Sequence, residues 1–197
     1  MRDLIVTENI SVDGVIDLGQ GWFDPQTQGD IDHSDLMAVL TEQGQAADAF
    51  LTGRVTFEQL RGYWQHLTGD QTGISDYLNR VQKYVVSATL TDPGWEPTTV
   101  LRGPLRAEIT ALKSAPGRDI VVTGSITLVH ALIAAGLVDE YRLFVYPVVA
   151  GKGARLFGGD GTSRQAGLRL AEARPFRSGV VLLRYRPRER SSPASTA

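Results

Sequence analysis

Residues 119–136 read DIVVTGSITLVHALIAAG, and this stretch decides the fold. Its first part, Ile120 to Thr123, is apolar and β-branched, which is typical of a buried strand. Gly124 and Ser125 interrupt the strand, and a helical pattern follows that ends near Gly136. A strand that turns through a glycine into a helix presents free backbone N–H groups and a positive dipole end, where phosphates bind. Taken alone, the turn more often contains a glycine that serves only backbone geometry, because one Gly-Ser turn is far short of a dinucleotide-binding motif.

The composition is that of one globular domain. The chain has 197 residues, of which 42% are hydrophobic and 21% charged, enough for a substantial core. A net charge of −2 without a basic block before the C-terminus argues against nucleic acid as a partner. The absence of cysteine excludes disulfides, thiolate metal sites and a cysteine nucleophile. No N-terminal stretch is apolar enough for a signal peptide or membrane span, so we expect a soluble, cytoplasmic protein without a membrane partner.

Strand and helix patterns alternate through the first two thirds of the chain, and strands close it. We expect strands at 4–11, 49–52, 84–87, 98–101, 120–123, 139–149, 168–176 and 180–185. We expect helices from Asp32 or Ser34 to about 45, from 54 to about 64, and over 74–81, 104–113 and 126–136. This order predicts an α/β sandwich with a mostly parallel sheet and an antiparallel C-terminal edge. We expect one domain over 1–186 and a disordered tail over 187–197.

Three of the predicted strands end in glycine, serine or threonine. They are the strands at 49–52, 84–87 and 120–123, followed or closed by Gly53, Ser87 and Gly124. In an open α/β sheet, ligands bind outside the carboxyl ends of the strands. Three such strand ends in one sheet predict a nucleotide cofactor.

Four segments carry a resemblance to a known family: SVDGVI at 11–16, LTGRVTFE at 51–58, KYVVSATL at 83–90, and the long stretch from Val121 to Phe157. Together they make the chain similar to the dihydrofolate reductase-like superfamily. Within it, the chain most resembles the C-terminal reductase domain of the bifunctional riboflavin-biosynthesis deaminase-reductase. The resemblance covers about residues 3 to 186. It implies a three-layer α/β/α sandwich, NADPH as cofactor and a homodimer.

The resemblance also implies which residues bind NADPH. A first helix turn at Gly53, Arg54, Val55 and Thr56 would hold the pyrophosphate and the adenosine-side phosphate, with Ser87 and Ala88 near the 2′-phosphate. A second turn would comprise Thr123, Gly124, Ser125, Ile126, Thr127 and Leu128. Ser125 and Ile126 stand where the family often has consecutive glycines. Arg54 favours NADPH over NADH because a guanidinium can pair a phosphate bidentately.

The implied substrate is a small molecule next to the nicotinamide. By resemblance, Asn9 and Ile16 lie beside the nicotinamide and the substrate, and the helix that contains Val39 lines the substrate pocket. Folate-reducing relatives have one buried carboxylate on that helix. Asp35 is the best match for this catalytic group and Asp32 the second; both also suit a helix N-terminus.

Trp22 lies on the long loop between the first strand and this helix. It would either cover the substrate pocket or fix the loop to the core.

These residues lead to one main hypothesis and two alternatives. The main one is an NADPH-dependent oxidoreductase that transfers hydride to a pterin- or pyrimidine-like heterocycle or another C=N or C=O substrate. The first alternative is a 5-amino-6-(5-phosphoribosylamino)uracil reductase or a dihydrofolate reductase proper. The second is a non-catalytic protein that binds NADPH or sequesters a ligand. His33, His66 and His130 have no metal-ligand spacing, so no metal site is expected.

Overall fold

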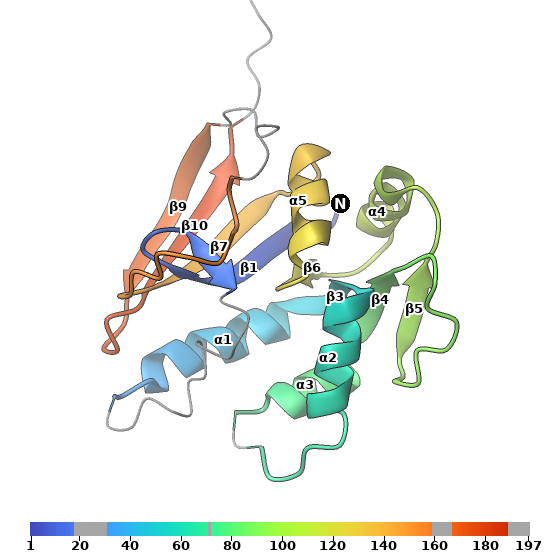
Figure 1. Cartoon of the computed structure of the whole chain (residues 1–197), viewed down its shortest axis with the longest axis horizontal. Helices are drawn as coiled ribbons and strands as arrows, with labels where there is room; N and C mark the ends of the chain where they lie inside the picture. Colours follow the sequence, from blue (N-terminus) through green and yellow to red (C-terminus); the bar gives the residue numbers. More distant parts are fainter. Residues whose placement is uncertain (18–30, 71, 159–166, 189–197) are drawn as a thin grey trace, which may run out of the picture.

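A computed structural model describes residues 1–17, 31–70, 72–158 and 167–188 of the chain (Figure 1). Within these ranges the chain forms five helices: α1 (Ser34–Ala46), α2 (Arg54–Trp64), α3 (Ile74–Arg80), α4 (Leu105–Ser114) and α5 (Ile126–Ala134). The main-sheet strands are β1 (Leu4–Ser11), β3 (Ala47–Gly53), β4 (Gln82–Val86), β5 (Thr98–Leu101), β6 (Asp119–Val122), β7 (Glu140–Tyr146), β9 (Leu168–Pro175) and β10 (Val181–Pro187). The predicted elements are all present, with shifts of a few residues at their ends.

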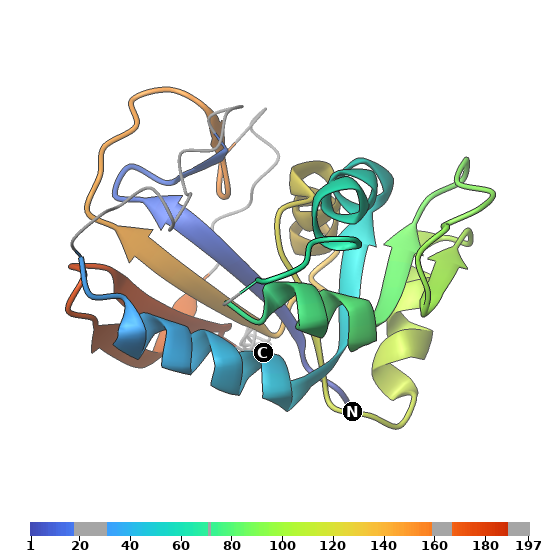
Figure 2. The same cartoon turned by 90° about the horizontal axis from the view of Figure 1, so that it is seen from below.

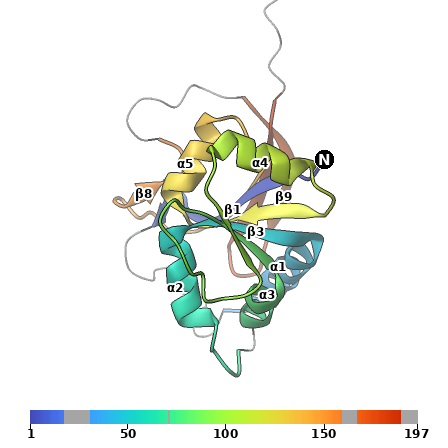
Figure 3. The ribbon, with the colours of Figure 1, turned by 90° about the vertical axis from the view of Figure 1, so that its right-hand side faces the viewer.

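The strand order is β5-β4-β3-β6-β1-β7-β10-β9. The first six of these are mutually parallel, whereas β10 is antiparallel to β7 and to β9. The mostly parallel sheet with an antiparallel C-terminal edge is thereby confirmed. Helices α1, α2 and α3 cover one face and α4 and α5 the other (Figure 3).

Apolar side chains on both faces form the core. On the face of α4 and α5, residues such as Val6 and Ile120 pack against Leu128 and Leu132 of α5. On the other face, the core below α2 and α3 includes Phe57, buried with 1% exposure. Burial on both faces explains why the central strands are nearly continuous apolar runs.

Two details differ from the prediction. The strand expected over 139–149 ends at Tyr146, where Pro147 has no N–H for a ladder and the Val148 N–H bonds the Tyr146 carbonyl at 2.7 Å. A second, two-stranded sheet pairs β2 (Val15–Asp17) with β8 (Ala154–Arg155). Two-residue strands have too little pattern to be recognised in a sequence.

An ion network lies at the amino ends of the central strands. Glu140, at the start of β7, is fully buried and bonds Arg142 at 2.7 Å and Arg184 at 2.9 Å. Arg186 bonds Glu140 at 3.1 Å and also pairs with Asp3. Burial raises the pKa of Glu140, but the hydrogen bonds from Arg184 and Arg142 outweigh burial and leave its pKa below the ordinary value. This network joins β1, β7 and β10 at the edge opposite to the predicted ligand site.

Candidate cofactor and active site

The three strands singled out by their polar ends are neighbours in the sheet, in the order β4-β3-β6. Because they are parallel, their carboxyl ends share one edge. After β3 the chain enters α2 on one face, and after β6 it enters α5 on the other face. Figure 1 shows α5 on one side of the sheet and α2 on the other, and in Figure 2 both helices lie beyond the end to which the arrow of β3 points. Such a divergence between adjacent strands opens the crevice in which α/β proteins bind their ligands.

Ser125 joins the two helix-entry turns. Its hydroxyl accepts the backbone N–H of Gly53 at 3.0 Å and lies 3.0 Å from the hydroxyl of Thr52. In return, the backbone N–H of Ser125 donates to the Thr56 hydroxyl at 3.1 Å. The departure from glycine at position 125 therefore has a structural role: the side chain holds the first turn of α2 against the first turn of α5.

The turn after β6 runs through the left-handed backbone region. Gly124 has φ 59° and Ser125 has φ 49°, the latter being the only positive φ of a non-glycine residue in the described ranges. A Cβ on Gly124 would approach Thr56 Cγ2 to 3.4 Å. Gly124 is thus needed for its conformation and for the close approach of the two turns.

The backbone N–H groups in the first turns of α2 and α5 are not capped by the side chain of the N-cap residue. Neither Gly53 nor Ser125, the two N-cap residues, makes a side-chain cap hydrogen bond, and the first α5 amide bonded back along the helix is that of Val129. Two positive helix ends therefore meet at one place, which suits a pyrophosphate. The predicted binding residues of these turns lie here, with Val55, Arg54 and Thr127 exposed, Thr56 and Ile126 half-buried, and Leu128 buried in the core.

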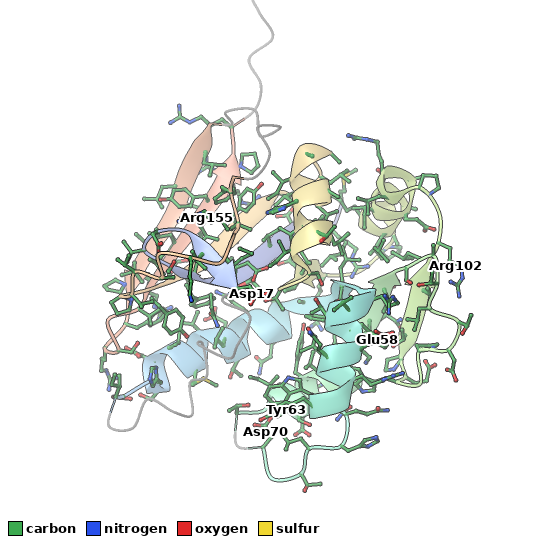
Figure 4. The ribbon with its side chains drawn as sticks, in the orientation of Figure 1. Asp17, Glu58, Tyr63, Asp70, Arg102 and Arg155 are labelled. Atoms are coloured by element: carbon green, nitrogen blue, oxygen red, sulfur yellow. The ribbon has the colours of Figure 1, made fainter. Side chains whose placement is uncertain are left out.

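Two arginines and a serine follow the carboxyl ends of β3, β4 and β5: Arg54, Ser87 and Arg102. Arg54 is exposed and pairs with Glu58 at 2.9 Å one turn further along α2. The buried Ser87 hydroxyl accepts the N–H groups of Thr89 and Leu90, beside the exposed Ala88. Arg102, just after β5, donates to the carbonyls of Leu90 at 2.6 Å and Ser87 at 3.5 Å (Figure 4).

Arg102 was not among the binding residues predicted from the sequence. Its position directly after a strand adjacent to β4 is the signal that could have found it.

The predicted substrate residues lie in different surroundings. Asn9 is half-buried on β1, and Ile16 is 9% exposed and packs into the main core. Val39 is 4% exposed and packs with Phe144 in the core between α1 and the sheet. Trp22 lies outside the described residues. The structure therefore brings Asn9 to the carboxyl half of β1 and uses Val39 for packing.

The two candidate carboxylates, Asp32 just before α1 and Asp35 in its first turn, are both bound by Arg177, in the turn between β9 and β10. Asp35 accepts the Arg177 backbone N–H at 3.0 Å, and Asp32 pairs with the Arg177 guanidinium. Hydrogen bonds from Ser34 and the Arg177 charge lower the pKa of Asp32 to about 2. These carboxylates fix the start of α1 to the hairpin, and a catalytic role of Asp35 remains a prediction.

A third carboxyl group was missed altogether. Glu8, on β1, is 5% exposed, and its Oε1 has no hydrogen-bond partner among the described residues. Burial raises the pKa of Glu8 to about 8, although the Gly124 N–H and the Thr123 hydroxyl act in the opposite direction. The sequence carried a signal, because Glu8 continues the alternation of Leu4, Val6 and Ile10 on the buried face.

Two kinds of feature are absent from the described ranges. No group of three histidine or carboxylate side chains there is placed to hold a metal ion. None of the helices in those ranges has both the length and the apolar character needed to cross a bilayer.

Comparisons with known proteins agree with this geometry. The model of the RibD C-terminal domain matches residues 2–182. An uncharacterized Bacillus subtilis (strain 168) protein, YyaP, is 31% identical over 140 residues, which cover 70% of this chain and 73% of YyaP.

Two solved structures share the fold. One is a putative riboflavin biosynthesis protein from Shewanella sp. PV-4, with a TM-score of 0.69 and 18% identity over 95% of this chain and 99% of that chain. The other is a diaminohydroxyphosphoribosylaminopyrimidine deaminase/5-amino-6-(5-phosphoribosylamino)uracil reductase from Thermotoga maritima. Its TM-score is 0.64 at 14% identity, over 95% of this chain and 57% of that chain. Fold, turn geometry and family model lead to one assignment: the chain belongs to the RibD C-terminal domain family.

Proposed function

We propose that the protein is an NADPH-dependent reductase of a small heterocycle, pterin- or pyrimidine-like, or of another C=N or C=O substrate. The observation that carries the proposal is the pair of helix-entry turns held together by Ser125 at the carboxyl edge of β3 and β6. The family supports it, since one structural neighbour is described as a uracil reductase. When bound, NADPH would supply a hydride from its nicotinamide.

The residues present fit a dinucleotide phosphate. The amides at the start of α2 and α5 would bind the pyrophosphate, with Gly124 leaving room for close approach. Arg54, Ser87 and Arg102 would bind the adenosine-side 2′-phosphate, because guanidinium groups pair a phosphate with charge-assisted bonds. The half-buried Asn9, on β1, would orient the ring that reacts.

The first test is a calorimetric titration of the whole chain with NADPH and NADH side by side. We expect NADPH to bind with micromolar affinity or better, about −8 kcal/mol, and more tightly than NADH. Failure of both cofactors to bind would overturn the proposal. Tight NADPH binding without oxidation against pterin, pyrimidine, imine and carbonyl substrates would instead favour a nucleotide-binding protein without turnover.

We also propose a homodimer in the cytoplasm, on the resemblance to riboflavin-type reductases. Size-exclusion chromatography with light scattering tests the assembly directly. A mass close to 21.4 kDa, that of one chain, would overturn the dimer.

A further inference from the structure

A buried carboxyl group lies where the candidate site meets the central strand. Glu8 is on β1 between β6 and β7, in the carboxyl half of the strand. Its neighbours include Thr123 and Gly124, the first residues of the turn into α5. The face of β1 that carries Glu8 is otherwise apolar, formed by Leu4, Val6 and Ile10. The group therefore adjoins the predicted binding turn and is shielded from water.

The environment of Glu8 is unusual for a carboxylate. Glu140, the other glutamate that is more than nine-tenths buried in the described ranges, is surrounded by Arg142, Arg184 and Arg186. Glu8 has no such cation, and Oε1 has no partner among the described residues. A buried carboxyl without a cation to balance its charge is held in its neutral form, in which it can donate a hydrogen bond. Oε1, left without a partner in the described part of the chain and beside the predicted binding turn, is the oxygen that a ligand atom could meet.

No charged side chain perturbs this group. On α5 the titratable residue is His130, whose ring bonds the Arg155 carbonyl at 3.0 Å. On β7, Arg142 and Glu140 pair with each other at the amino end of the strand. On β6, Asp119 lies at the same amino end and pairs with Arg142 at 3.6 Å. The proton on Glu8 is thus controlled by burial, the Thr123 hydroxyl and the Gly124 amide.

We infer that Glu8 is the proton donor of the proposed reductase, giving its carboxyl proton to the substrate nitrogen or oxygen when the adjacent carbon is reduced. This inference rests on the proposed function. The competing carboxylates are less suited, because Asp32 and Asp35 are bound by Arg177.

The bonds balance with NADPH as the reductant. The carbon of the C=N or C=O bond gains a hydride, and the π electrons move to the heteroatom. Glu8 supplies the proton: its O–H bond breaks, an N–H or O–H bond forms on the substrate, and the electron pair stays on the carboxylate. After the product has left, a proton from the solvent restores the Glu8 carboxyl. A buried acid with a pKa near the working pH is suited to both transfers.

The inference is tested first without turnover, by infrared spectra of the whole chain as a function of pH, alone and with NADPH. In the wild type we expect a protonated-carboxyl band at pH 7 that disappears near pH 8 and shifts when NADPH binds. Glu8→Gln should lack the band. Its absence in the wild type at pH 7 would overturn the inference.

The second test measures NADPH oxidation with dihydrofolate and 5-amino-6-(5-phosphoribosylamino)uracil. Glu8→Gln should lower kcat by about 100-fold or more, abolish the decline of rate above pH 8, and leave the NADPH affinity unchanged. Glu8→Asp should recover part of kcat. Wild-type kcat and pH profile in Glu8→Gln, with cofactor binding and turnover intact, would overturn the inference alone. No NADPH binding and no oxidation by the wild type would overturn the proposed function and the inference together.

Discussion

The Ser125 hydroxyl accepts the backbone N–H of Gly53 at 3.0 Å, across 72 residues of the chain. We predict that Ser125→Ala loses about 1–3 kcal/mol of unfolding free energy, because the Gly53 amide loses its acceptor. Ser125→Gly loses the same bond but relieves the positive φ, so it should be about 1 kcal/mol more stable than Ser125→Ala. Urea unfolding of both variants measures the difference. Equal stabilities would contradict the role of backbone strain.

Arg54 and Arg102 should set the preference for NADPH over NADH. Removing one guanidinium from a 2′-phosphate costs about 1.5–3 kcal/mol, a ten- to hundredfold loss. We expect Arg54→Ala and Arg102→Ala each to weaken NADPH by this amount and NADH by much less, as measured by calorimetry.

Glu58→Gln is the matched control for Arg54. It removes the carboxylate that pairs with Arg54 and should tighten NADPH binding. Equal losses for both cofactors in the arginine variants would remove the 2′-phosphate assignment.

Glu8 should make stability depend on pH. Its pKa is higher in the folded state, about 8 against 4.5, so the folded chain holds a proton that the unfolded chain releases. This contribution to stability is fully present below about pH 4.5 and is lost as the pH rises through about 8. The loss is at most about 5 kcal/mol.

In the Glu8→Gln variant, the slope of unfolding free energy against pH should flatten between these limits. Chemical denaturation at several pH values provides the measurement. Identical slopes in the variant and the wild type would show that Glu8 titrates normally.

The ion network around Glu140 gives the opposite pH dependence. The pKa of Glu140 is lowered on folding, so its contribution is present above the ordinary pKa and is lost as the pH falls below it. We expect Glu140→Gln to lose about 3–5 kcal/mol of unfolding free energy, because the buried Arg142 loses a partner at 2.7 Å and Arg184 and Arg186 lose theirs as well. Glu172→Gln, which removes a half-buried partner of Arg184, should lose less than about 1 kcal/mol. Similar losses of unfolding free energy in Glu140→Gln and Glu172→Gln would contradict the conclusion that Glu140 holds the ion network together.

A catalytic role of Asp35 can be tested separately from its contact with the hairpin of β9 and β10. Asp35→Asn and Arg177→Ala both weaken that contact, and each should cost about 0.5–1 kcal/mol of stability. If Asp35 takes part in catalysis, kcat falls only in Asp35→Asn. Equal activities in the two variants would leave Asp35 with the structural role alone.

Much of the fold could be predicted, because periodic apolar patterns report local structure. The strand ends at Gly53, Ser87 and Gly124 were expected to share an edge, and β4, β3 and β6 are neighbours. The contact between Ser125 and Gly53 could not be predicted, since it depends on which strands are adjacent. Glu8 was not singled out, because glutamate side chains are rarely buried, although its place in the alternation of Leu4, Val6 and Ile10 was a buried one.

The order of the strands has a consequence for synthesis. β1 is made first, yet its neighbours in the sheet are β6 and β7, which start at Asp119 and Glu140. On a ribosome, the apolar strand that carries Glu8 therefore waits for more than half of the chain before it can be enclosed. Chaperones that hold nascent apolar segments would meet this strand early, and the two proposed binding turns can come together only after α5 (Ile126–Ala134) has been made.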